Sequence, residues 1–585
     1  MNDHEFLRIY DFVHRLRRPF RDIVDVNDEA SWSIIHYLMR SELEGYPVSI
    51  SKLASVSGLG RGTAIRRIQG MIRDGLIERR PAAQRPKSFT LHPTKRLSDL
   101  TVSYATQTKA LIAEILGGRN MNEHEANYYF GAPRRGDAVI PPINLLKSRI
   151  ASGIELQFLL NDDNYFAAMR NMWSDFRNNL ASARSFKLLH QNDLYHEGLA
   201  NGARDVSAYD VIAIDMPWLG EFASKGLIMP IGDMIRASDI NPMDFHPSIW
   251  STTTWQRVEY GVPIYCTIEV LACRTDLFEE AGLALPRTFD DVIAAGRKFH
   301  NPSAERYGIA WNAAPMPLAS SFMFFLGCAG ETVLSIRRTP TGYATENLDR
   351  QHMRPQVDSA AALVVLDYMH KLLEIAPPGT LDAHWDDSCE VFLRGQSAMG
   401  YVWTMRAAQF EAEVRSAVKR RVAYVPQPSG AGGTNTSPIG GFLLCIPSNI
   451  DPKRLPLATE ALSWMASRES MKEHVKNGFP VAPRFSVSAD PEAIGSSQLI
   501  RFVGNLANRN LLRNWQRPPV PFYTAMERII GEEVHDALSG RKSDKAALRD
   551  AQNRLDAIIR EDLPATPSLR RSPGSNRRPR PTRKT

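Results

Sequence analysis

The chain has 585 residues, of which 43% are hydrophobic and 23% are charged, and its formal net charge is +7. These fractions are close to those of ordinary globular proteins, and they exclude a largely disordered, collagen-like or coiled-coil chain. The longest nearly apolar stretch, 316–330, is shorter than the ~20 residues that a membrane-spanning helix needs, so no membrane segment is expected.

Positive charge gathers at the two ends of the chain. Residues 1–100 hold 17 Lys and Arg against 12 Asp and Glu, and residues 568–585 hold seven basic residues and no acidic one. The region between them is therefore acidic overall. A basic end on an acidic body predicts a nucleic-acid-binding module attached to a larger unit.

Cysteine usage and the N-terminus point to a reducing compartment. The five cysteines are scattered and form no CxxC pair, which is typical of free thiols and not of a disulfide or zinc framework. The first twenty residues mix acidic and basic side chains and lack the apolar stretch of a secretory signal. We therefore predict a cytoplasmic location, and we expect no metal and no cofactor.

The first hundred residues show three helical patterns followed by two short strands. After an N-terminal helix within 1–27, helices are expected from Asp28, over 49–56 and over 61–74. A glycine-containing turn separates the second helix from the third, and Gly75 ends the third. Strands over 76–79 and 87–91 complete the segment.

The run LASVSGLGRGTAIRRIQGMIRDGLIERR, which begins at Leu53, resembles the MarR and related bacterial regulator families. The resemblance implies a winged helix-turn-helix DNA-binding domain over 28–96. Between residues 61 and 96 there are ten basic residues against two acidic ones, as a surface that meets phosphates requires. The residues expected to contact operator DNA are Arg61, Thr63, Arg66, Arg67, Arg79, Arg80, Arg85 and Lys87. The alternative is a winged unit used for protein contact, or a solvated charged ribbon.

A helical linker is expected over 97–150, with a helix over 97–116 and a Gly- and Pro-rich stretch after it. MarR-like regulators form dimers through helices that flank the winged unit. The resemblance therefore implies a homodimer through this segment and the N-terminal helix, and a plain connector is the alternative.

The body of the chain begins at residue 151, where strands alternate with helices. Strands are expected over 154–160, 185–189 and 211–214, and a helix over 165–180 lies between the first two. This order predicts an α/β fold with parallel strands.

Five ordered motifs relate the body to a known family. YDVIAIDMPWLGEFASKGLI, from Tyr209, and YGVPIYCTIEVLACRTDLFEEAGLALPRTFDDVIAAGRKF, from Tyr260, resemble the extracellular solute-binding proteins of sugar ABC importers, the maltose-binding-like group. FLRGQSAMGYVW, PIGGFLLCIPS and RPPVPFYTAMERIIGEEVHDALSG follow in family order. The resemblance implies a two-lobed, periplasmic-binding-protein-like (type II) clamp over 151–565, with crossing strands and a ligand between the lobes. Residues 566–585 are expected to form a basic disordered tail.

The ligand site is expected at the carboxyl ends of strands, where open α/β sheets bind their ligands. That rule selects Asp163, Asp215 and Trp218. A sugar has apolar ring faces and a rim of hydroxyls, so its site needs flat aromatic groups and hydrogen-bonding side chains. Placement within the motifs adds Tyr265, Trp311, Trp403 and Arg406, with Trp403 as a stacking platform and Asp215 as a hydroxyl acceptor. For each aromatic residue the alternative is a place in the core.

The sequence contains no GxSxG, P-loop or HExxH motif, so no enzyme is expected. Taken together, the patterns predict a cytoplasmic transcription regulator. In it, the winged helix binds duplex operator DNA and the two-lobed body senses a small solute, a sugar. The alternative is a substrate-binding protein of a carbohydrate ABC transporter.

Overall fold

The computed structural model describes residues 28–562, apart from 45, 82–88, 118–155, 163–185, 239, 347, 349–351, 413–415, 477–478, 480–481, 497 and 515. The predictions of an N-terminal helix, a linker after residue 117, a helix over 165–180 and a basic tail fall outside these residues. So do three predicted site residues: Arg85, Lys87 and Asp163.

The N-terminal module contains three helices and a two-stranded antiparallel ribbon, in the predicted order. The elements are α3 (Glu29–Glu44), α4 (Ile50–Val56), α5 (Arg61–Arg73), β1 (Ile77–Pro81), β2 (Phe89–Pro93) and a longer helix, α6 (Lys95–Gly117). The Ser49 hydroxyl caps α4 by accepting a hydrogen bond from the Lys52 amide at 3.2 Å. Gly75, at φ +69°, lets the chain leave α5 for β1. Buried residues such as Ile34, Leu53 and Ile68 give the module its own core.

The first lobe of the body is built on a parallel sheet. Its strands are β3 (Phe158–Asn161), β4 (Phe186–Leu189) and β5 (Val211–Asp215), and β3 lies between the other two. Every residue of β5 is buried, as expected for a parallel strand covered on both faces. The helices of this lobe are α8 (Gln191–Gly202), α9 (Leu219–Ser224), α10 (Gly232–Arg236), α11 (Pro247–Trp250), α18 (Leu455–Met465), α19 (Arg468–Lys476), α20 (Phe485–Ser488) and α21 (Pro491–Ser496).

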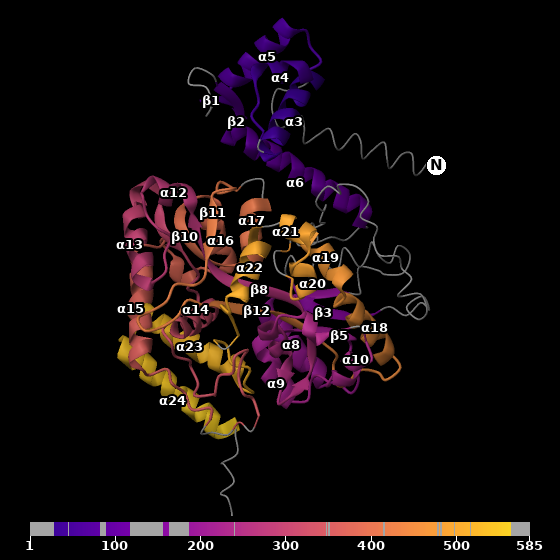
Figure 1. The fold of residues 1–585 in the computed structure, drawn as a ribbon, viewed down its shortest axis with the longest axis vertical. Helices are drawn as coiled ribbons and strands as arrows, with labels where there is room; N and C mark the ends of the chain where they lie inside the picture. The colour runs from indigo at the N-terminus through magenta and orange to yellow at the C-terminus, as the bar shows by residue number, and fades with distance from the viewer. Residues whose placement is uncertain are drawn as a thin grey trace, which may run out of the picture.

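The second lobe carries the strands β9 (Tyr307–Ala310), β10 (Ser397–Trp403) and β11 (Val422–Val425). Its helices are α12 (Thr275–Glu280), α13 (Phe289–Phe299), α14 (Pro315–Cys328), α15 (Ala360–Glu374), α16 (Trp385–Leu393), α17 (Thr404–Ala412), α22 (Gln498–Asn508), α23 (Tyr523–Leu538) and α24 (Asp544–Asp562). The Thr288 side chain and Asp291 form a capping box at the start of α13. Figure 1 shows α23 and α24 packed together along the lower edge of this lobe.

Two long strands join the lobes. β8 (Gly261–Arg274) pairs with β12 (Ser437–Cys445) along its first half and with β10 and β11 along its second half. β12 in turn pairs with β5, so the sheet order is β4-β3-β5-β12-β8-β10-β9. The expected pair of α/β lobes joined by crossing strands is therefore present in the described residues.

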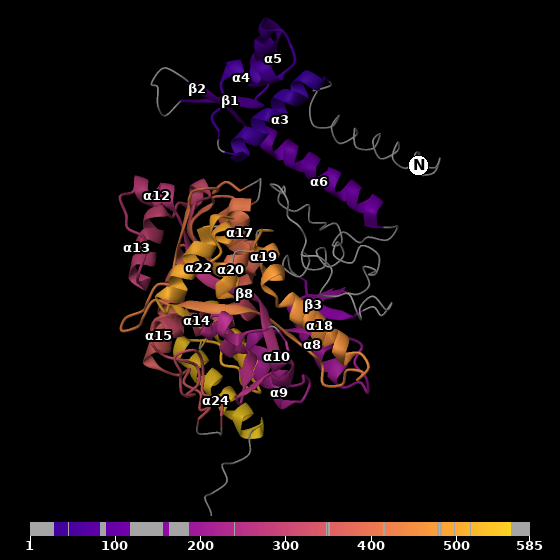
Figure 2. The same ribbon diagram turned by 45° about the vertical axis from the view of Figure 1, so that its right-hand side comes forward.

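The N-terminal module lies against the second lobe. Figures 1 and 2 show it at one end of the body, next to α12 and α17. Arg420, in the turn that follows α17, donates a hydrogen bond from Nη2 to the backbone carbonyl of Leu43 at 2.9 Å. Within the described ranges, every helix is too short or too polar to span a lipid bilayer.

Two helical glycines give a matched test of the packing between α14 and α23. A Cβ on Gly531, in α23, would lie 2.2 Å from the Pro315 carbonyl oxygen at the start of α14, whereas a Cβ on Gly504, in α22, meets nothing within 4 Å. Gly531→Ala should lower the free energy of unfolding by ~1–3 kcal/mol, because backbone atoms cannot give way. Gly504→Ala should raise it by ~0.5–1 kcal/mol. Urea denaturation measures both, and a neutral Gly531→Ala would contradict this packing.

Candidate functional site

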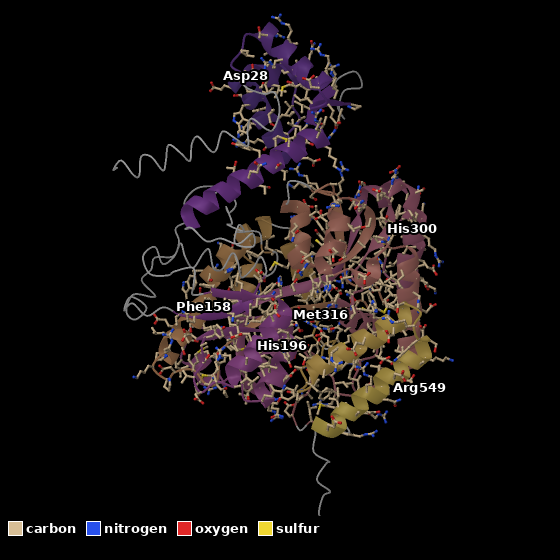
Figure 3. All side chains as sticks on the ribbon, turned by 180° about the vertical axis from the view of Figure 1, so that it is seen from behind. Asp28, Phe158, His196, His300, Met316 and Arg549 are labelled. Carbon is tan, nitrogen blue, oxygen red and sulfur yellow. The ribbon has the colours of Figure 1, made fainter. Side chains whose placement is uncertain are left out.

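A pocket of about 450 Å³ opens between the two lobes. It is lined by α8 and the short 3-10 helix η5 (Met216–Trp218) on one side, and by the first turns of α14 and α23 on the other. Gln191 follows β4, Trp218 follows β5, and Pro315 follows β9 by a few residues. The pocket therefore lies beyond the carboxyl ends of strands from both lobes, where α/β sheets bind ligands. Figure 3 shows two residues of its lining, His196 and Met316, close together in the middle of the body.

A buried ion pair lies behind Gln191, one of the residues that line this pocket. Asp215 Oδ2 accepts hydrogen bonds from Gln191 Nε2 at 2.9 Å and from Arg517 Nη1 at 3.1 Å. Asp215 is 4% exposed and Arg517 is 9% exposed. Burial raises the pKa of the Asp215 carboxyl, and the Arg517 charge opposes that rise. Burial also disfavours the guanidinium charge, but Asp215 outweighs it and holds the pKa of Arg517 above its ordinary value.

Two further buried carboxyl groups surround Arg517. Glu527 lines the pocket, and its Oε1 accepts hydrogen bonds from the Tyr523 hydroxyl at 2.8 Å and the Ser320 hydroxyl at 3.4 Å. Burial and the nearby Asp215 carboxylate raise the pKa of Glu527 to about 7. Glu269, on β8, accepts a hydrogen bond from the Gln427 amide, and burial raises its pKa to about 8. Three carboxyl groups thus share the charge of Arg517.

Hydrogen bonds between the lobes border the pocket. Thr524, in α23, lies with its hydroxyl 2.8 Å from Glu221 Oε2 and 3.0 Å from the Tyr195 hydroxyl of α8. Tyr195 donates to Glu221 Oε1 at 2.6 Å, and Lys225 also contacts that oxygen at 2.6 Å. The lobes are therefore in direct polar contact at this border.

Some buried donors at the lobe interface lack acceptors among the described residues. These are Trp218 Nε1, Trp311 Nε1 and Arg517 Nε. Buried polar groups in native proteins are nearly always hydrogen-bonded, to protein, water or ligand. Trp218 is also one of the residues that line the pocket.

The structure brings two of the predicted ligand residues to the pocket. Trp218 lines it directly, and Asp215 lies behind it in the ion pair with Arg517. Trp403 is 7% exposed and is not part of the lining. The centroid of its ring lies 5.7 Å from Arg517 Cζ.

The remaining predicted residues lie apart from the pocket lining. Tyr265 stacks on Phe442 of β12 with 5.6 Å between ring centroids, so it packs between the crossing strands. Arg406 is held by Asp386 at 2.7 Å. Trp311 is 1% exposed, directly after β9.

Residues that sequence reasoning missed supply most of the pocket's polar groups. Gln191 comes two residues after the predicted strand 185–189, so the strand-end rule was sufficient to find it. Arg517 and Glu527 lie in a motif that carries the family resemblance, but no local pattern links them to Asp215. The Arg517–Asp215 contact spans 302 positions of sequence.

The basic residues of the N-terminal module divide into two groups. Arg61, Thr63 and Arg66 lie exposed on α5. Arg67 instead binds Asp28 and lies 2.8 Å from the Ser31 hydroxyl. The wing arginines are also engaged within the module. Arg80 pairs with Glu78 at 2.7 Å and with Glu42 at 3.3 Å, and Arg79 lies over the Phe89 ring at 4.7 Å.

A second cavity, of about 440 Å³, lies between residues 242–259 of the first lobe and 339–346 of the second. Arg257 and Glu346 form an exposed ion pair at 3.0 Å across it. Met216, after β5, and Arg517 also line this cavity, whereas the first pocket receives residues that follow three strands, β4, β5 and β9. The described residues include no group of three or more metal-ligating side chains. The first pocket is therefore the better candidate site.

Comparison with known proteins relates the body of the chain to solute-binding proteins. The family described as bacterial extracellular solute-binding protein matches residues 195–472. A mannitol-binding protein of Pseudomonas aeruginosa is 20% identical over 387 residues, which is 63% of this chain and 85% of that protein. Among solved structures, an ABC transporter solute-binding protein of Agrobacterium radiobacter K84 in complex with ribitol has a TM-score of 0.62 and 23% identity. It covers 69% of this chain and 99% of its own.

A second solved structure, an ABC transporter solute-binding protein of Agrobacterium vitis S4 with bound D-mannitol, has a TM-score of 0.60 and 20% identity. It covers 69% of this chain and 98% of its own. At these identities the likeness establishes the fold. The prediction of a two-lobed, periplasmic-binding-protein-like α/β body is confirmed.

These findings overturn two predictions. The predicted transcription regulator is wrong: the family match is to extracellular solute-binding proteins, the solved structures are solute-binding proteins of ABC transporters, and the alternative prediction fits better. The predicted cytoplasmic location is wrong, because the matched family is extracellular. Neither a DNA operator nor a homodimer finds support in these relatives. Exposed basic side chains misled the prediction, because Arg67 and Arg80 are paired with acidic residues of their own module. The body of this chain has the fold of the ABC-importer solute-binding proteins.

Proposed function

We propose that the protein binds a small polyhydroxyl compound, a sugar or a sugar alcohol, in the pocket between its lobes. Its role is then that of a substrate-binding protein of a carbohydrate ABC transporter. The observation that carries the proposal is the position of the pocket, which collects polar and aromatic side chains at strand ends of both lobes. The relatives that bind mannitol and ribitol support the same class of ligand.

The size and chemistry of the pocket suit such a ligand. About 450 Å³ falls within the ~300–1,000 Å³ typical of small-molecule sites. Trp218 offers an aromatic surface for C–H groups and an unpartnered N–H for a hydroxyl oxygen. Glu527 and Gln191 add groups that accept and donate hydrogen bonds to a hydroxyl rim. We infer that Trp218 contacts the ligand directly and that Asp215 acts through its bonds to Gln191 and Arg517.

Titration calorimetry of the full chain with D-mannitol, ribitol and maltose tests the proposal. We expect at least one of the three to bind with a one-to-one stoichiometry. Trp218→Phe should then weaken that binding by about two- to tenfold, because it keeps the ring and removes a hydrogen bond worth ~0.5–1.5 kcal/mol.

Trp464→Phe is the matched control for this variant. Trp464 is half-buried on α18, away from the pocket lining, so its replacement should leave the affinity unchanged. Equal affinities of wild type and Trp218→Phe would contradict the direct contact of Trp218. Absence of binding by all three probes would contradict the proposed function.

We also infer that residues 28–96 form a winged-helix-like module separate from the ligand-binding body. Support comes from its three helices, its ribbon and its own core. The pocket draws no lining residue from this module, so solute binding is proposed as a property of the body alone.

A further inference from the structure

We propose that Glu527 makes the pocket selective for polyhydroxyl compounds that are uncharged or positively charged, and that it excludes those bearing a carboxylate or phosphate group. This inference rests on the proposed function and defines the charge class of its ligand. Two groups of charges carry it: the buried carboxyl groups around Arg517, and the charged side chains of α23 and α24 near Arg528.

Around Arg517, buried carboxyl groups outnumber cations. Three carboxyl groups, those of Asp215, Glu269 and Glu527, share the single charge of Arg517, which contacts Asp215 directly at 3.1 Å. Glu269 and Glu527 contact no cation among the described residues; their hydrogen-bond partners are the uncharged side chains of Gln427, Tyr523 and Ser320. Of these two acids, Glu527 is the one that lines the pocket. Within the described part of the chain, its hydrogen bonds all reach Oε1, so Oε2 is left to accept from a ligand.

At the mouth, the charges are balanced. Arg528 also lines the pocket, but Glu532 holds it at 3.0 Å one turn along α23. Arg554 contacts both Glu532 and Glu533, and Lys542 contacts Glu533 and Asp550. Three cations and three carboxylates therefore form one compensated network. The charge that a ligand meets inside the pocket is that of Glu527.

An anion beside Glu527 would face a carboxylate in a site of low polarity, where like charges in contact cost several kcal/mol. A neutral ligand carries no charge that Glu527 could repel, so it avoids this cost whether or not the carboxyl is ionised. A protonated amine gains instead, because it adds a cation in direct contact with Glu527, whose neighbouring cation, Arg517, is shared with Asp215 and Glu269. Glu527 therefore admits neutral and positively charged ligands and disfavours anionic ones.

A series of three probes that differ in charge at one carbon tests the inference: D-mannitol, its aldonate D-mannonate, and 1-amino-1-deoxy-D-mannitol. Calorimetry at pH 8 on the full chain gives three affinities. We expect mannonate to bind about tenfold or more weaker than mannitol, and the amine to bind at least as tightly as mannitol. The selectivity is the ratio of the affinity for mannitol to the affinity for mannonate. Glu527→Gln should lower this ratio about tenfold. Glu374→Gln, which removes an exposed carboxylate on α15, should leave the ratio unchanged.

The possible results separate a failure of the inference from a failure of the proposed function. Equal binding of mannitol and mannonate by the wild type, or an unchanged ratio in folded Glu527→Gln, would overturn the inference while the proposed function stands. Failure of all three probes to bind the wild type would overturn the proposed function and the inference together. Binding of the amine more weakly than mannitol would also overturn the inference.

The pH dependence of the wild type provides a readout that needs no folded variant. The mannitol-to-mannonate ratio should widen from pH 6 to pH 8, as Glu527 ionises. Among the described residues, the charged and titratable groups around Glu527 are Asp215, Arg517 and Tyr523, together with Tyr195, His196, Arg528 and Glu532 of the pocket lining. His196→Asn removes the imidazole that lines the pocket together with Glu527 and should keep the widening, and a ratio of affinities that is flat with pH in this variant would overturn the inference.

Discussion

Replacing Arg517 by Met should lower the free energy of unfolding by about 3–5 kcal/mol and abolish ligand binding. The guanidinium is buried, and it is the cation beside Asp215, Glu269 and Glu527 in the described part of the chain. Its removal leaves buried carboxylates with no opposite charge, which is far more costly than removing an ion pair as a whole. Chemical denaturation at pH 7 measures the loss of stability.

Two comparisons isolate the electrostatic cause. Arg513→Met removes a half-buried arginine whose recorded hydrogen bond goes to a backbone carbonyl, so it should cost less than ~1 kcal/mol. The double variant Asp215→Asn with Arg517→Met removes both charges and should recover much of the stability that Arg517→Met loses. If the free energy of unfolding of Arg517→Met were within ~1 kcal/mol of the wild-type value, the three carboxyl groups would not depend on Arg517.

Local pattern was sufficient to predict the elements that position the site. The strand ending at Asp215 is a short apolar run, and the structure places it over Val211–Asp215, with all five residues buried. A helix was predicted over 49–56, and α4 spans Ile50–Val56 with Ser49 as its N-cap. These features depend on neighbouring residues, so one sequence contains all the information that they need.

Long-range contacts account for what the sequence did not reveal. Trp403 was predicted at the end of a strand and lies there, but whether it faces a ligand or the core depends on Gly440, on a different strand. Arg517 meets Asp215 only because the chain returns to the crossing strands before α23. Charge counting was also insufficient, because it cannot tell a free arginine from one paired within its module, such as Arg67.

Replacing Trp403 by Ala should lower the free energy of unfolding by about 3–5 kcal/mol, the cost of removing a buried aromatic side chain and leaving a cavity. The ring packs edge-on against Phe324, with centroids 5.7 Å apart, and its far edge fits against Gly440. A Cβ on Gly440 would lie 2.7 Å from ring atoms Cη2 and Cζ3 of Trp403. Gly440→Ala should therefore cost ~1–3 kcal/mol, because the ring must move.

The double variant decides whether this contact is the reason for the glycine. Once Trp403 is Ala, the cavity accepts the extra methyl group, so Gly440→Ala should cost ~1–2 kcal/mol less than it does beside Trp403. Urea denaturation of the wild type, the two single variants and the double variant measures the four free energies of unfolding. If the losses of the two single variants simply add up in the double variant, the packing of Trp403 on Gly440 is contradicted. The same variants separate the two roles predicted for Trp403. A core residue loses stability when it is replaced, whereas a stacking platform would lose affinity for the sugar while the variant keeps its stability.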